Sequence, residues 1–495
     1  MPGKPVLRIA LAVWLLAGIA QGQTPTPASD ADDLAAIVEQ QAIQIRQLQE
    51  RLDRWESIYE PDLSTEPGCE APLTIRRLPV LTEQSTAPSC QAIDDSASHR
   101  LLHFQTEYDD GLVIRPYDPA KHPFELKING WIQFRHHGFS RDVSSWTSMA
   151  GNTHSIRNRN AFDIERGRLV FSGYAKDPRL TYFLQLDGDT DGGHAVDFFD
   201  YWWAWDFSDD FQIQFGKRKV TASRQWLLGA RSTRLTERPM ACDFFRPDRT
   251  LGIFANGKFG ETGRYELMVG NGYSTSNLPD SATDNNLTFA ATSYFDIGGK
   301  YGSQIVDFQP SDDPVARLGH SMVYSPITEG TNGLPLGEAD FTRLTDGTQL
   351  TANGALAPGV TVSAYKIYLY SVDFAAKYRG WSFNSEVYLR WIEQLEANGA
   401  LPTYNLYQHG YFVEGGHFVI PRTLEWNVRY SQINGRFGNS GEVAVGLNWF
   451  PRKSTDMKLS IDFTNVVSSA LQNTSSDILV GDDGRLIRAQ IQTEF

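Results

Sequence analysis

The chain has 495 residues, of which 41% are hydrophobic and 21% charged, and its formal net charge is −14. This composition excludes a disordered or collagen-like chain. No run of 18 apolar residues occurs, which excludes a transmembrane helix. The chain combines 12 Trp, 20 Tyr, 28 Phe and 42 Gly with a mean hydropathy of −0.36. A polar average with many aromatic residues is typical of a transmembrane β-barrel, whose apolar outer and polar inner faces cancel. The alternative is a large secreted β-sandwich enzyme.

Residues 1–22 predict a signal peptide. Lys4 and Arg8 precede twelve apolar residues, 9–20, a stretch too short to span a bilayer. Small residues near its end offer cleavage points. We therefore expect an exported protein; the alternative is a buried core helix.

Residues 31–60 predict a periplasmic α-helical coiled coil. Apolar and aromatic residues recur from Leu34 to Tyr59 at alternating steps of four and three, and Gln41 fills one seam position. Fewer than four heptads make a weak contact, so we expect this segment to assist oligomerisation. The alternative is an amphipathic helix that packs on its own chain.

Residues 61–123 are rich in proline and predict a linker. The segment contains Cys69 and Cys90, and a disulfide between them is plausible in an oxidising periplasm. Cys242 is then left as a free thiol. No CxxC motif and no His/Cys spacing suggests a metal site, so neither a metal nor a cofactor is expected.

From residue 124 to the C-terminus, the hydrophobic period is two. Apolar and polar residues alternate in 124–135, 424–431, 457–464 and 487–495. No helical pattern follows that could cover the apolar face, whereas a closed barrel satisfies every backbone group in lipid. We predict an all-β fold, a transmembrane antiparallel β-barrel of about 16 strands over 124–495. Tryptophans near the predicted strand ends are expected in the interfacial girdles: Trp131, Trp381, Trp391 and Trp449.

Several segments resemble the phosphate-selective porin O and P family of outer-membrane channels. They are NGWIQFR (129–135), IERGRLVFSGYAKDPRLTYFLQLDGD (164–189), FFDYWWAWDF (198–207), FQIQFGKRK (211–219), RPDRTLGIFANGKF (246–259) and ELMVGNGY (266–273). Their joint order carries the resemblance, which runs through most of 124–495. The terminal Phe495 on an alternating strand also resembles the end of outer-membrane barrels. The resemblance implies a sixteen-stranded trimeric pore that favours small anions, phosphate above all.

The same resemblance implies a pore constriction built from paired arginines, an acid and further bases. Arg166 matches one of the paired arginines, Glu165 stands in place of the other, and Arg168 lies two residues further on, on the same side. The acid corresponds to Asp200. The bases correspond to Lys217, Lys219 and a position near Arg224, with Trp226 at the nominal match. Because Glu165 would offset the charge of Arg166, general anion or mixed selectivity stays open.

The charge along the chain gives separate support for an anion path. Between residues 211 and 249, nine bases face three acids, a local charge of +6 in a chain of −14. Basic side chains that line a narrow pore lower the barrier for anions. The alternative is a solvated loop that binds lipid phosphate.

Motifs of catalysis are absent from the sequence. The Asp-rich segment 187–193 imitates the start of a calcium loop, but Phe198 replaces the required bidentate Glu, so a turn is expected. No GxSxG or HExxH motif occurs. We therefore predict a non-enzymatic outer-membrane porin for passive diffusion of small solutes, with anions such as phosphate preferred. Its expected partners are two further copies in a homotrimer, outer-membrane lipid, small anions and the cell envelope, contacted through the coiled coil; no nucleic acid partner is expected. The alternatives are an envelope-tethering barrel and, less in keeping with the motifs, a barrel hydrolase.

Overall fold

The structure is a computed structural model that describes residues 104–495 apart from 191–195, 277, 279–281 and 329–336. The predicted signal peptide, the predicted coiled coil and the predicted Cys69–Cys90 disulfide lie outside the described residues. None of the helices in the described ranges is long and apolar enough to cross a membrane.

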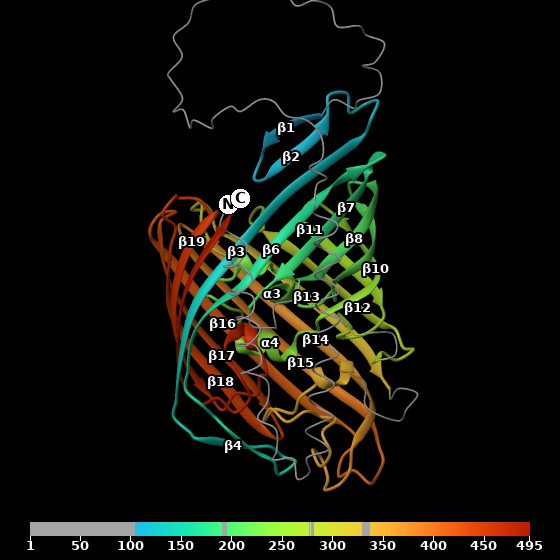
Figure 1. Cartoon of the computed structure of the whole chain (residues 1–495), viewed down its shortest axis with the longest axis vertical. Coiled ribbons are helices and arrows are strands. Elements are labelled where there is room, and N and C mark those ends of the chain that lie inside the picture. Colours follow the sequence, from blue (N-terminus) through green and yellow to red (C-terminus); the bar gives the residue numbers. More distant parts are fainter. Residues whose placement is uncertain (1–103, 191–195, 277, 279–281, 329–336) are drawn as a thin grey trace, which may run out of the picture. The chain divides into compact units, whose positions relative to one another are not determined.

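Sixteen antiparallel strands form one closed barrel (Figure 1). Each barrel strand pairs with the next one along the chain, and β20 pairs with β3 to close the sheet. The first eight are β3 (Phe124–Arg141), β6 (Arg159–Ala175), β7 (Asp177–Gly188), β8 (Val196–Ser208), β9 (Phe211–Lys219), β10 (Arg249–Phe259), β11 (Gly263–Gly270) and β12 (Thr288–Ile297). The other eight are β13 (Val315–Ile327), β14 (Val362–Tyr378), β15 (Trp381–Ala397), β16 (Leu406–Ile420), β17 (Leu424–Gly435), β18 (Gly438–Trp449), β19 (Met457–Val467) and β20 (Gly484–Glu494). The predicted fold class and strand number of the barrel are confirmed.

Two hairpins accompany the barrel. β1 (Phe104–Tyr108) and β2 (Leu112–Pro116) form the first, which lies within the segment predicted as a linker. β2 pairs with β3 before Trp131, the residue at which the pairing of β3 with β20 ends. The hairpin therefore pairs with the start of β3, which extends past the end of β20. β4 (Ser145–Thr147) and β5 (Thr153–Ser155) pair at the opposite end of the barrel (Figure 1).

The exposure of the strand residues follows the predicted alternation. Ile132 on β3 and Val428 and Tyr430 on β17 are exposed on the outer face, whereas Arg135 and Arg429 point inward and are buried. An apolar outer wall and a polar inner wall are what a barrel in lipid requires. The outer face of the barrel therefore fits a membrane.

Three of the four tryptophans predicted for the interfacial girdles are exposed on the outer face: Trp381, Trp391 and Trp449. The prediction is wrong for Trp131, which lies on the same side of β3 as Gln133 and Arg135 and faces the lumen. The alternation gives the outward position to Gly130, where a Cβ would lie 2.8 Å from the Arg168 carbonyl oxygen and 2.9 Å from the Phe495 ring. A glycine is needed at this close approach, and the tryptophan beside it points inward.

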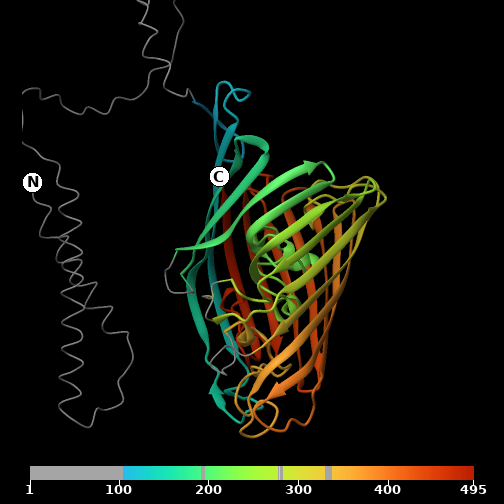
Figure 2. The same cartoon turned by 90° about the vertical axis from the view of Figure 1, so that its right-hand side faces the viewer.

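The loop between β9 and β10, residues 220–248, folds into the lumen and is called the inward loop (Figure 2). Its helices are α3 (Arg224–Leu227), η2 (Ala230–Ser232) and α4 (Met240–Phe245). Pro239 and Pro247 flank α4, consistent with the preference of proline for helix starts and for positions beyond helix ends. α4 contacts β15, β16 and β17, and the ring of Phe245 stacks on Tyr388 at 5.5 Å.

An apolar core lies inside the barrel where α4 meets the strands. It also includes residues of the loop between β13 and β14, which contains η4 (Gly337–Phe341). Phe245, Leu344, Ile367 and Phe412 are completely buried in this core. Part of the lumen is therefore filled by protein, and the inward loop decides where space remains.

The two ends of the barrel differ in the length of their connections. At the end that holds the C-terminus, most strands are joined by short turns, for example 379–380 and 421–423. At the other end, longer loops include 142–158 and 468–483, the second of which contains η5 (Thr474–Ser476). These are called the short-turn end and the long-loop end.

Candidate functional site

A cavity of about 420 Å³, called the inner chamber, lies between the inward loop and the inner faces of β3 and β6–β10. Seven basic and seven acidic side chains line it: Arg166, Arg168, Lys219, Arg231, Arg238, Arg246, Arg249, Glu165, Asp187, Asp189, Asp200, Glu237, Asp243 and Asp248. The formal charge of the lining is therefore balanced, although the bases cluster along the sequence. The positions of the individual charges decide what the chamber attracts.

Four of the six predicted constriction residues line the inner chamber: Arg166, Arg168, Asp200 and Lys219. Lys217 does not. It is buried, and its ammonium donates a hydrogen bond to the Phe198 carbonyl at 2.9 Å. Arg224 does not line the chamber either, because α3 directs it toward Asp373 on β14, with which it pairs at 2.6 Å. The structure thus brings the early-strand arginines, the acid and one of the predicted bases together.

A β-bulge changes the wall beside Arg166. The register of β3 and β6 shifts between Gln133 and Phe134, which leaves Glu165 as an extra residue in β6. The Glu165 carboxylate is buried and lies 3.2 Å from Arg135 Nη1 and 3.6 Å from Arg166 Nη2. Strict alternation would put Glu165 and Arg166 on opposite faces. The bulge places both on the inner face, where the glutamate offsets the charge of the arginine.

Glu237 of the inward loop also binds these arginines. Its Oε1 lies 2.5 Å from Nη2 of Arg135 and 2.5 Å from Nη1 of Arg166. Burial alone would raise the pKa of Glu237, but Arg166 and Arg135 together hold it well below its usual range. The ionised carboxylate therefore anchors the loop to the barrel wall and neutralises part of the charge of Arg166.

Four cationic groups surround the buried ring of Trp226. The distances to the ring centre are 4.4 Å for Arg246, 4.6 Å for the Lys219 ammonium, 5.4 Å for Arg238 and 5.7 Å for Arg249. An aromatic face attracts cations, which helps to hold several of them in one place. This cluster is called the Trp226 cluster. In the sequence, Trp226 stood out only as a departure from the family pattern.

Two of these four bases are ion-paired. Arg249 Nε lies 2.9 Å from Asp200, and Arg246 Nε lies 3.1 Å from Asp243. Asp248 approaches both arginines at longer distances. These three carboxylates balance most of the charge of the cluster.

The other two bases are held by backbone carbonyl groups. Lys219 Nζ donates to the carbonyl oxygens of Trp226 at 2.7 Å and Leu228 at 2.9 Å. Arg238 donates to Leu228 at 2.7 Å and to Gln225 at 3.3 Å. Within the described ranges, no ion pair joins Lys219 or Arg238 to a carboxylate. The four bases around Trp226 therefore outnumber the neighbouring carboxylates by one.

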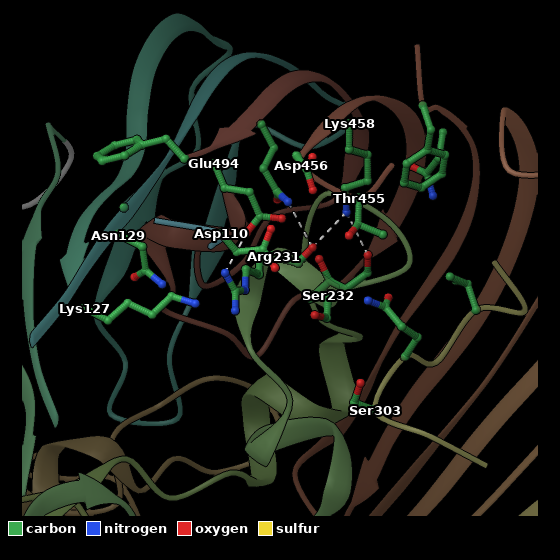
Figure 3. Close-up of a pocket in the computed structure, with 18 of the residues that line it drawn as sticks. Asp110, Lys127, Asn129, Arg231, Ser232, Ser303, Thr455, Asp456, Lys458 and Glu494 are labelled. Atoms are coloured by element: carbon green, nitrogen blue, oxygen red, sulfur yellow. Dashed lines mark hydrogen bonds and ion pairs between the residues drawn. The ribbon is translucent and has the colours of Figure 1, made fainter. Parts of the chain in front are cut away.

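A second cavity of about 440 Å³, called the mouth chamber, lies at the short-turn end (Figure 3). It shares Asn129 and Arg231 with the inner chamber. Arg231 Nη1 pairs with Glu494 of β20 at 2.6 Å, and Lys458 Nζ donates to the carbonyls of Arg231 and Thr233 at 3.3 and 3.1 Å. The tip of the inward loop is thus fixed to the last two strands, and the two chambers adjoin at Arg231.

The remaining predicted groups are placed as follows. Asp187 in β7 pairs with Arg168 at 2.5 Å instead of facing a calcium loop, and Asp191 and Gly192 lie outside the described residues. Cys242 in α4 is a free thiol, as predicted, and it is completely buried. Burial raises the pKa of this thiol.

A closed β-barrel with an apolar outer wall, a polar lumen and a loop folded inside it defines the class of outer-membrane channels. The model of the family "Phosphate-selective porin O and P" matches residues 144–495, and the chain belongs to this family of porins. The family predicted by resemblance is therefore confirmed.

Solved structures of other porins are similar to this chain at low sequence identity. OprB of Pseudomonas putida at high pH shares 8% identity over 76% of this chain and 95% of that chain, with a TM-score of 0.47. OmpF of Salmonella typhi in complex with daunomycin shares 11% identity over 79% of this chain and 100% of that chain, with a TM-score of 0.46. The outer membrane channel DcaP of Acinetobacter baumannii shares 9% identity over 75% and 97%, with a TM-score of 0.43. No curated protein sequence matches the chain.

Proposed function

We propose that this porin is a passive channel for small anions, with phosphate among its solutes. The observation that carries the proposal is the Trp226 cluster, where Lys219 and Arg238 bind carbonyl groups while their two neighbours are ion-paired. Coulomb interactions at an anion's position depend on charges within about a Debye length, roughly 10 Å at 0.1 M salt. The local excess of bases therefore counts for more than the charge of −14 over the whole chain.

The conduction path runs through the inner chamber, past Arg231, and into the mouth chamber. Both cavities are lined by Asn129 and Arg231, which supports one continuous polar route. Because bacterial barrels have short periplasmic turns, the mouth chamber opens to the periplasm. The exposed Arg231 side chain stands where the two chambers meet.

Transport along this route is electrodiffusion without chemistry. Guanidinium and ammonium groups replace part of the hydration shell of an anion, and guanidinium groups match phosphate oxygens in pairs. A passing ion must also leave, and Asp200 and Asp243 beside the bases keep binding weak. Arg166 acts mainly through structure, because Glu165 and Glu237 already bind it.

The proposal also covers the export of the chain, its N-terminal segment and its assembly. Residues 1–22 direct export and are removed, and residues 31–60 form a periplasmic coiled coil. A Cys69–Cys90 disulfide ties the linker 61–123 together. Three chains assemble as a homotrimer in outer-membrane lipid, and the coiled coil contacts the cell envelope.

Phosphate block of chloride current tests the proposal. Purified protein in a planar bilayer should conduct chloride, and added phosphate should reduce this current. The double variant Lys219→Gln/Arg238→Gln should need several times more phosphate for half-block. Arg485→Gln is the control, because Arg485 is exposed on the outer face of β20. Equal block in the double variant and the wild type would contradict the role given to the Trp226 cluster.

A further inference from the structure

Three potential metal ligands meet on the inner side of β3 and β6, outside both chambers. Nδ1 of His137 lies 3.1 Å from Oδ2 of Asp163 and 2.8 Å from Oδ1 of Asp477. One ligand atom from each residue falls within 4.8 Å of the others. Donor atoms that bind one ion at about 2.1 Å lie roughly 3 Å apart at neighbouring positions. The spacing of the three atoms therefore fits one shared cation.

The surroundings of the His137 nitrogen fit a bound cation. Nδ1 is buried, and two carboxylates approach it at the same time. A single N–H can serve only one acceptor along its own direction. A metal ion binds the nitrogen lone pair and both carboxylates at once.

The loop that carries Asp477 is held in a position suited to a metal ligand. Arg135 Nη1 binds Oδ2 of Asp477 at 3.1 Å, which leaves Oδ1 facing His137. Three arginines donate hydrogen bonds to successive backbone carbonyls of residues 475–477: Arg135 at 2.7 Å, Arg488 at 2.8 Å and Arg159 at 2.9 Å. Asp477 itself adopts a left-handed backbone conformation with φ of 60°. A ligand fixed by such surroundings loses little entropy when an ion binds.

The charge around the cluster favours a divalent ion. Two guanidinium groups, Arg135 and Arg166, face four carboxylates in one connected network: Glu165, Glu237, Asp163 and Asp477. Arg159 and Arg488 do not change this balance, because each is paired with an acid of its own, Asp482 and Asp462. Counted with all four carboxylates ionised, the network lacks two positive charges. A bound divalent cation supplies both.

We propose that His137, Asp163 and Asp477 bind one divalent first-row transition metal ion, of which Zn²⁺ is the natural probe. One imidazole and two carboxylates form a ligand set that suits this class of ion. The side chains of His137 and Asp163 are 12% and 20% exposed, so water can reach the remaining positions of the ion. The bound ion would fasten the loop 468–483 to β3 and β6. The inference does not depend on anion selectivity.

Zn²⁺ titration of the folded full-length protein tests the inference. The protein is stripped with a chelator in detergent, and binding is followed by calorimetry, with Co²⁺ absorption as a second measurement. The wild type should bind one Zn²⁺ per chain at this site, and His137→Ala should weaken that binding at least tenfold. His136→Ala is the matched control, because His136 is the adjacent residue and bonds Asn160 instead of the cluster. This control should bind like the wild type.

Asp163→Asn provides a second variant that keeps the shape of the site. It should also weaken Zn²⁺ binding, while its heat-dependent gel migration shows a folded barrel. Absence of Zn²⁺ binding to folded wild type at millimolar metal would overturn the inference. Equal loss in the His137 and His136 variants, or unchanged binding in all variants, would also overturn it.

Discussion

The two faces of the inward loop meet very different surroundings. The face formed by α4 packs against β15, β16 and β17, where Phe245 and Tyr388 stack and are completely buried. The opposite face carries Arg238 and Arg246 toward the inner chamber, beside Lys219. They are called the packed face and the chamber face.

This difference shows which part of the chain determines the position of the cavity in the lumen. The strands present the same alternation of polar and apolar residues on both sides of the barrel, as β3 and β17 illustrate. The position of the cavity therefore does not follow from the strands. It follows from one loop, whose apolar residues fill one side of the lumen and whose bases line the other.

The largest expected effect is on stability, and it is seen by removing one phenylalanine ring from the packed face and one from the inner chamber. Phe245→Ala removes a completely buried ring from the packed face, which costs about 3–5 kcal/mol and should loosen the loop. Phe199→Ala removes a partly exposed ring beside Arg168 and Arg249 in the inner chamber, and should cost only about 1 kcal/mol.

Urea unfolding in detergent, followed by tryptophan fluorescence, measures both variants. Channel recordings should also show a larger conductance for Phe245→Ala, because a loosened loop widens the lumen. Equal losses of stability in the two variants would remove the distinction between the faces.

Much of the fold could be predicted from the sequence because alternation is a local property. The parity of β3 and β17 follows from residue types along the chain, and the number of strands follows from the length of 124–495. The inward orientation of Trp131 could not be predicted from residue type alone. It depends on the close approach at Gly130, which involves the distant Phe495.

The site was less predictable because it depends on contacts between distant segments. The bulge at Glu165 breaks the alternation, and the sequence around it shows no signal for an extra residue. Lys217 and Arg224 belong to the predicted basic stretch, but the structure engages them with Phe198 and Asp373, away from the chamber. His137 and Asp477 are 340 residues apart, so no spacing motif could join them.

The next effect concerns a buried acid near the packed face. Glu338 lies in η4 next to Ala339 of the apolar core, and burial, with a smaller contribution from Asp284, raises its pKa to about 8. The folded state keeps this proton while the unfolded state releases it near pH 4.5. Stability should therefore fall as the pH rises from about 4.5 to 8, by roughly 1.4 kcal/mol per pH unit.

Urea midpoints between pH 5 and pH 9 check this slope. Glu338→Gln cannot ionise, so its stability should lose the part of the pH dependence that the wild type shows over this range. If the variant and the wild type have the same slope, the proton is not held by Glu338.

Thiol chemistry compares access to the two faces. Cys242 on the packed face is completely buried, and burial raises the pKa of its thiol, so both access and reactivity are low. Ser172→Cys introduces a thiol into the lining of the inner chamber. A water-soluble methanethiosulfonate should modify the introduced thiol at least tenfold faster and reduce the current. Mass mapping identifies the labelled peptide, and faster labelling of Cys242 would contradict the assignment of the packed face.

The smallest effect concerns the junction of the two chambers. Glu494→Gln removes the partner of the half-exposed Arg231, and such a surface pair contributes less than about 1 kcal/mol to stability. The unpaired Arg231 should raise the preference for chloride over potassium by less than about twofold at 0.1 M salt. The gain should vanish at 1 M salt, where the Debye length is about 3 Å. An unchanged preference at low salt would place Arg231 outside the conduction path.

The zero-current potential of the wild type in a tenfold KCl gradient tests the central claim most directly. The Trp226 cluster predicts a potential with the sign of an anion-selective pore, despite the net charge of −14. Lys219→Glu/Arg238→Glu should reverse that sign, whereas Arg485→Glu, on the outer face of β20, should leave it unchanged. A cation-selective wild type, or an anion-selective double variant, would contradict the account.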